Sequence, residues 1–167
     1  KQFTAAAFMQ LVEAVLIGLD DPMTRYLPNY PTQGHEVSIR HLLTHTSGIK
    51  SYTSIGDAFW LKAALLDLSH TEMLELFQDE PFDFAPGEGY SYNNSGYYLL
   101  GMIIEEVSGE SYDAYLGTHV FGPLGLSRSS YCHEAQIIQG RAEGYEQGPD
   151  GLLNDGSISM NTPIAVR

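Results

Sequence analysis

One stretch near the start of the chain restricts the fold more than any other part of the sequence. Residues 3–19 are strongly apolar, and only Thr4, Gln10 and Glu13 interrupt them. With these interruptions the stretch falls short of a membrane span. The pattern predicts a helix over 3–17 whose apolar side chains surround nearly the whole helical wheel. Since a helix of that kind belongs in the middle of a larger core, the sequence predicts a helical protein built around it.

The composition restricts the function. The 167 residues include 8 Lys and Arg against 21 Asp and Glu, which gives a formal net charge of −13. This acidic balance repels phosphate backbones and anionic lipid, so binding to nucleic acid or to a membrane surface is disfavoured. The single cysteine, Cys132, rules out a disulfide within the chain. The length is that of about one domain.

Helix signals recur along the first three-quarters of the chain. Ser38 is expected to cap one helix, and Ser69 with Glu72 forms a capping box for another. Asn94 is expected to cap the longest of the later helices, and Ser111 to cap the last. The expected helices cover 3–17, 39–45, 57–68, 73–77, 97–107 and 112–120.

The pattern changes toward the end of the chain. Gly109 follows the helix expected over 97–107 and is expected to end it. From Ser127 onward, glycine, polar and acidic residues dominate, with short apolar pieces only. We therefore expect one domain in two parts, a helical region at 1–126 and a Gly-rich, acidic, partly irregular tail at 127–167.

Two strings carry the most specific information about function. Residues 39–49 read IRHLLTHTSGI, and residues 84–101 read FAPGEGYSYNNSGYYLLG, with Tyr-x-Asn just before an expected helix. Together with the opening KQFTAAA, they resemble the serine β-lactamase and penicillin-binding-protein superfamily. The likeness is greatest to the branch of class C β-lactamases, DD-peptidases, D-aminopeptidases and β-lactamase-like esterases. It is dense from residue 1 to about 126 and thinner afterwards.

The resemblance implies a fold and a setting for this chain. The family has an α+β fold, and these residues resemble its helical portion. We therefore expect a mainly α structure in which the sheet portion is largely missing. The family also implies a small-molecule or peptide substrate and a periplasmic or secreted location. No cofactor is expected, and the interrupted apolar stretch at 3–19 predicts no membrane span.

The resemblance further implies acyl-enzyme chemistry. In the family a serine hydroxyl attacks a carbonyl, and a lysine one helical turn later shares its helix face. The tyrosine of Tyr-x-Asn faces that lysine, so either can accept the serine proton, and the asparagine holds the lysine and a substrate amide. Carried over residue by residue, Lys1, Tyr92 and Asn94 take these three roles. Tyr90 is a further candidate, as a wall of the substrate cleft.

Two departures from the family pattern affect the expected activity. The nucleophilic serine would lie three positions before Lys1, outside the 167 residues, and the third motif (Lys-Thr-Gly or His/Trp-x-Gly) is not found. The strand with that motif also supplies an oxyanion donor, worth about 10²–10³ in rate. We therefore expect a fragment of a serine hydrolase for a β-lactam, D-alanyl peptide or small ester. By itself it should be inactive and should self-associate through its uncovered apolar surface.

Other interpretations stay open beside this one. A non-catalytic helical module would bind a partner without turnover. A metal could bind at His35, His41 and His45, although no Glu follows His41 as in zinc proteases; the family resemblance instead makes these histidines structural. Ser47 and Lys50 form a literal Ser-x-x-Lys. A nucleophile needs the start of a rigid buried helix, whereas Ser47 is expected past a helix end.

Overall fold

The computed structural model describes residues 1–56, 66, 68–131, 137, 139–140, 145–149 and 151–154. The described part is mostly helical, as the sequence predicted, with one small two-stranded sheet. The helix expected over 57–68 lies outside the described residues, apart from Leu66 and Leu68. The elements in chain order are α1 (Gln2–Glu13), η1 (Met23–Arg25), α2 (Ile39–Leu43), η2 (Tyr52–Ser54), α4 (His70–Glu75), α5 (Asn94–Ser108), α6 (Tyr112–Tyr115), a π-helical turn η3 (Leu116–Phe121), β1 (Tyr145–Gly148) and β2 (Gly151–Asn154).

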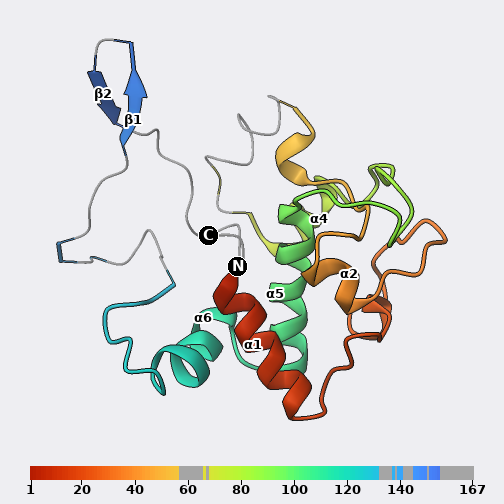
Figure 1. Ribbon diagram of the computed structural model, residues 1–167, viewed down its shortest axis with the longest axis horizontal. Coiled ribbons are helices and arrows are strands. Elements are labelled where there is room, and N and C mark those ends of the chain that lie inside the picture. Colours follow the sequence, from red (N-terminus) through yellow and green to blue (C-terminus); the bar gives the residue numbers. More distant parts are fainter. Residues whose placement is uncertain are drawn as a thin grey trace.

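Helix α5 forms the centre of the described fold. Five of its apolar side chains are fully buried: Tyr98, Leu99, Leu100, Ile103 and Ile104. They follow one another around the helix, so α5 is covered on most of its sides. Helices α1, α2 and α6 all pack against it, and Figure 1 shows α1 and α5 side by side. Thus α5 holds the central position that the sequence analysis had given to the first helix.

Helix α1 is shorter than predicted. It ends at Glu13, four residues early, in a Schellman turn. The N–H of Leu16 donates to the carbonyl of Leu11 over 3.0 Å, and Val15 occupies the left-handed position with a φ of 60°. Glycine is the usual residue there, and a β-branched valine is strained in it. Because no glycine marks the turn, the apolar pattern gave no sign of it.

Helix α1 is also less buried than predicted. Its inner face buries Phe8 and Leu11 against the core, whereas Met9 is 43% exposed, and Leu16 in the following turn is 52% exposed. The prediction of an all-round buried helix is therefore wrong within the described residues. An apolar wheel shows which faces can be buried, but the neighbouring elements decide which of them are.

Serine caps begin α2 and α4, as the sequence predicted for Ser38 and Ser69; the full capping box at Ser38 was not predicted. The Ser69 hydroxyl accepts from the N–H of Glu72, and the Glu72 carboxylate accepts from the N–H of Ser69. At α2, Ser38 is paired in the same way with His41, whose Nδ1 accepts from the N–H of Ser38 over 3.3 Å. Helix α2 ends at Leu43, two residues earlier than expected.

The ends of α5 confirm one prediction and correct another. Gly109 closes the helix with a left-handed φ of 72°. At the start, Asn93 and not Asn94 caps the helix, because Oδ1 of Asn93 accepts from the N–H of Gly96 over 2.8 Å. Ser111 precedes α6 as expected, but its hydroxyl donates to the carboxylate of Asp113 and does not cap the helix.

The described part of the tail contains an antiparallel hairpin. Strand β1 pairs with β2, with Tyr145 opposite Asn154 and Gly148 opposite Gly151. Figure 1 shows this hairpin well separated from the helices. The sequence analysis had noted a short apolar piece here without assigning it to a strand. In the residues that the structure describes, no helix has the length and apolar character needed to cross a membrane.

Candidate active site

Segments far apart in the sequence meet where α5 begins. Lys1 directly precedes α1, Tyr92 lies in the loop before α5, and Asn94 is the first residue of α5. The Nζ atom of Lys1 donates to Oδ1 of Asn94 over 2.6 Å and lies 4.7 Å from the centre of the Tyr92 ring. The structure therefore brings together the three residues to which the family resemblance gave catalytic roles.

Asn94 is held through its side chain and its backbone. While Oδ1 accepts from Lys1, Nδ2 donates to the hydroxyl of Thr53 over 3.2 Å. The backbone N–H of Asn94 donates to the hydroxyl of Ser51, also over 3.2 Å, and the two hydroxyls lie 3.0 Å apart. Sequence reasoning missed both hydroxyl residues, which hold the amide with its oxygen toward the lysine.

The neighbouring Asn93 leaves Asn94 free for this contact. Asn93 is 4% exposed, caps α5 with its Oδ1, and donates from Nδ2 to the carbonyl of Ile49. The sequence analysis gave the cap and the lysine contact to the same asparagine. The structure divides the two tasks between consecutive residues, so neither side chain has to serve both.

Two tyrosine rings surround the lysine ammonium. Nζ of Lys1 lies 4.7 Å from the Tyr92 ring centre and 5.3 Å from that of Tyr97, at distances where a cation is attracted to a ring face. The Tyr97 hydroxyl donates to the carbonyl of Leu43, which ties that ring to α2. Tyr92 is 57% exposed. Of the two rings beside Lys1, Tyr92 is therefore the one accessible to a substrate.

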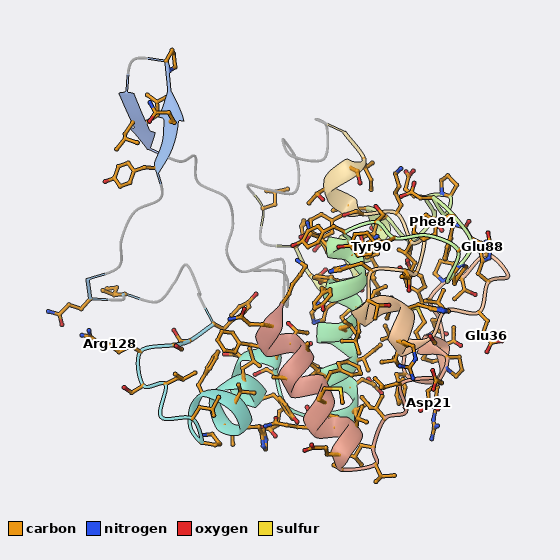
Figure 2. The ribbon with its side chains drawn as sticks, in the orientation of Figure 1. Asp21, Glu36, Phe84, Glu88, Tyr90 and Arg128 are labelled. Atoms are coloured by element: carbon orange, nitrogen blue, oxygen red, sulfur yellow. The ribbon has the colours of Figure 1, made fainter. Side chains whose placement is uncertain are left out.

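Tyr90 lies farther out on the same loop. It is 70% exposed and meets the ring of His45 edge-on, with the ring centres 6.1 Å apart. Figure 2 shows Tyr90 near the end of the molecule where α5 begins. The structure thus places the candidate cleft-wall residue at the outer rim of the group formed by Lys1, Tyr92 and Asn94.

His45 is a site neighbour that sequence reasoning treated as structural or as a candidate metal ligand, with no role in the reaction. Its ring centre lies 4.8 Å from that of Tyr92 and 5.0 Å from that of Tyr97. Burial, and next the positive charge of Lys1, lower the pKa of His45 below its ordinary value. The sequence signal was its place in the string HTSG, directly after α2.

A close approach of two loops positions these residues. Gly48 has a φ of 73°, and a Cβ added to it would lie 1.9 Å from the backbone oxygen of Phe84. Its carbonyl accepts from the N–H of Asp83, and the carbonyl of Thr46 accepts from the N–H of Gly87. Only glycine fits at 48, so this residue fixes the loop with Tyr90 and Tyr92 beside α2.

The literal Ser-x-x-Lys at 47–50 does not form a nucleophile pair. Ser47 is 1% exposed, and its hydroxyl accepts from the N–H of Ile49 over 3.3 Å. The Nζ atom of Lys50 donates instead to the carboxylate of Asp83 over 2.7 Å. Serine and lysine therefore have separate partners.

The three histidines considered for a metal have different surroundings. His35 packs on the ring of Phe82, His41 belongs to the capping box of α2, and His45 lies against the tyrosine rings. Across the described ranges, no three His, Cys, Asp or Glu side chains gather in a way that could hold a metal ion.

Comparison with known proteins shows the family to which this chain belongs. Residues 1–161 match the Beta-lactamase family, and the chain is a member of it. The resemblance seen in the sequence motifs is thereby confirmed.

Particular relatives are penicillin-binding proteins and amidohydrolases. The chain is 37% identical over 131 residues to penicillin-binding protein 4* of Bacillus subtilis, covering 77% of this chain and 28% of that protein. A D-stereospecific amidohydrolase from Streptomyces sp. superposes with a TM-score of 0.83 at 25% identity, over 99% of this chain and 53% of that one. An octameric penicillin-binding protein homologue from Pyrococcus abyssi superposes with a TM-score of 0.77 at 33% identity, over 99% of this chain and 38% of that one. This chain thus spans 28% to 53% of the length of these relatives.

Proposed function

We propose that this chain carries part of the active site of a serine hydrolase that forms an acyl-enzyme. Membership of the Beta-lactamase family supports a hydrolase of that kind. The observation that carries the residue assignment is the hydrogen bond from Lys1 Nζ to Asn94 Oδ1 at 2.6 Å. The same Nζ atom lies 4.7 Å from the centre of the Tyr92 ring. The substrate is a β-lactam, a D-alanyl peptide or a small ester.

Each of the three residues has a proposed task. Lys1 and Tyr92 together accept the proton of the attacking serine, and Asn94 orients the lysine. The Nδ2 atom of Asn94 reaches the Thr53 hydroxyl at 3.2 Å, the long end of the hydrogen-bond range. A substrate carbonyl can therefore replace that hydroxyl, while Tyr90 forms part of the cleft wall.

The remaining parts of the reaction centre are proposed to come from a longer protein. The family's serine would stand three positions before Lys1, and its third motif would be on a sheet strand beyond these residues. In this proposal residues 1–126 are the helical region of the β-lactamase-like domain and 127–167 are its tail. The 167 residues alone would be inactive.

Substrate turnover tests the proposed function. The full-length protein that contains this sequence is expected to hydrolyse at least one of three probes: a chromogenic cephalosporin, a D-alanyl-D-alanine peptide, or a short nitrophenyl ester. When hydrolysis of the acyl-enzyme is slower than its formation, stopped-flow traces should show a burst equal to the enzyme concentration. Saturable binding of all three probes without turnover would contradict the proposal and favour the non-catalytic module.

We propose in addition that the isolated chain self-associates. Apolar side chains stay exposed at α1 and on the hairpin, among them Met9, Val15, Leu16, Leu152 and Leu153. Contiguous apolar patches on soluble proteins are usually covered by a partner. The homologue from Pyrococcus abyssi is described as octameric.

Light scattering at several salt concentrations measures this association. The net charge of −13 opposes contact between copies, so the mean mass is expected to rise with salt. Leu16→Asp, which adds charge to the exposed turn after α1, should lower the mass more than Thr32→Asp in the loop before α2. A monomer without dye-accessible apolar surface at every concentration would disprove self-association.

A further inference from the structure

His45 and Lys1 share two aromatic neighbours. The His45 ring lies 4.8 Å from Tyr92 and 5.0 Å from Tyr97, with interplanar angles of 41° and 33°. The Lys1 ammonium lies over the same two rings. Any movement of the imidazole therefore changes the packing of the ring that is proposed to take part in proton transfer.

His45 also accepts hydrogen bonds from the backbone on both sides of Tyr92. Its carbonyl accepts from the N–H of Ser91 over 3.0 Å, and its Nδ1 accepts from the N–H of Asn93 over 3.1 Å. These two bonds bracket Tyr92 in the sequence. The residue itself has a φ of 60°, a left-handed conformation that directs both groups toward the tyrosine loop.

The bond from Asn93 selects one form of the imidazole. Because Nδ1 accepts a hydrogen bond, its lone pair is occupied and the proton of the neutral ring lies on Nε2. A doubly protonated ring would point an N–H at the N–H of Asn93. It would also add a positive charge beside Lys1. Among the residues that the structure describes, the phenols of Tyr90, Tyr92 and Tyr97 also face the ring.

We propose that His45 is a positioning residue that holds the Tyr92 ring against Lys1, and that it does so only as the neutral Nε2–H tautomer. This inference rests on the proposed function, because it gives His45 a task in the reaction assigned to Tyr92. A histidine that merely fills space would need neither a particular tautomer nor bonds on both sides of that one residue.

The inference predicts a pH dependence. As the pH falls through the pKa of His45, which burial and Lys1 place below its ordinary value, the ring gains a proton and releases Asn93. Between the unfolded and folded pKa values the unfolded chain binds more protons, so the stability contributed by His45 is present above this window and is lost on acidification. kcat is expected to fall over the same range, with little change in KM.

Three variants of the full-length protein test this role. His45→Asn keeps an acceptor and tolerates the positive φ but removes the ring and its titration; His45→Phe keeps a ring and removes the acceptor. Both are expected to lower kcat about tenfold or more while KM changes less than twofold, since misplacement of a reacting group acts on kcat. His45→Asn should also abolish the acid limb due to His45. The matched control His41→Gln, which alters only the capping box of α2, should keep the wild-type kcat and pH profile.

The wild-type protein supplies a second readout that needs neither activity nor a stable variant. Long-range proton–nitrogen correlation spectra are expected to show His45 with its proton on Nε2 at neutral pH. A proton on Nδ1 would overturn the proposal, as would a folded His45→Asn protein with wild-type kcat and pH profile. If the Tyr92→Phe protein keeps full activity, the proposed function fails, and the role of His45 fails with it. If the Tyr92→Phe protein is inactive while both His45 variants keep wild-type activity, the proposed function stands and only the role of His45 is wrong.

Discussion

Tyr92→Phe in the full-length protein is expected to slow acylation by about 10²–10⁴, the usual contribution of a general acid–base group. The ring would remain over Lys1, because the ammonium contacts its face at 4.7 Å, so the substitution removes the hydroxyl alone. Substrate affinity should therefore change little. Single-turnover acylation by a chromogenic cephalosporin separates the two effects, because it gives the rate and the binding constant independently.

Tyr26→Phe is the matched control for this experiment. The Tyr26 hydroxyl donates to the carboxylate of Asp21, in the loop around η1 and apart from the residues at the start of α5. Its removal should lower stability slightly and leave the acylation rate unchanged. Near-full activity of Tyr92→Phe would mean that the Tyr-x-Asn assignment is wrong.

The second large effect concerns the 167 residues by themselves. As an isolated polypeptide they are expected to show no saturable hydrolysis of a chromogenic cephalosporin or a short nitrophenyl ester. Removal of the nucleophile alone costs about 10⁶ in kcat in a well-studied serine protease. Ser47, the serine of the literal Ser-x-x-Lys at 47–50, is 1% exposed, and its hydroxyl accepts a backbone hydrogen bond. Turnover that a serine-acylating inhibitor abolishes would show instead that a nucleophile lies within the chain, and Ser47→Ala would then identify or exclude that residue.

The sequence predicted those features that depend on short motifs. The cap at Ser38, the capping box at Ser69 and the helix end at Gly109 follow from local chemistry that few other residues can supply. The grouping of Lys1 with Tyr92 and Asn94 followed from the family motifs, and the distances in the structure are compatible with it.

Features that depend on neighbouring elements could not be predicted from the sequence. Asn93 and Asn94 are chemically identical, so only the start of α5 decides which of them caps the helix and which meets the lysine. Val15, in the turn after α1, adopts a conformation that usually marks glycine. Helix α5 is the central helix, although the apolar wheel of the first helix had favoured α1. The contacts of His45 with two tyrosine rings arise only when the segment after α2 meets the loop before α5, which contains Tyr92, and α5 itself, which contains Tyr97.

Mapping the acylated residue tests the central claim most directly. The full-length protein would be incubated with a penicillin, quenched in acid, digested, and its peptides sequenced by mass spectrometry. The proposed function predicts one acyl group per protein, on a serine three positions before Lys1, and much slower labelling in the Tyr92→Phe protein. A label on another residue, or equal labelling rates in the two proteins, would contradict the assignment of Lys1, Tyr92 and Asn94 to acyl transfer.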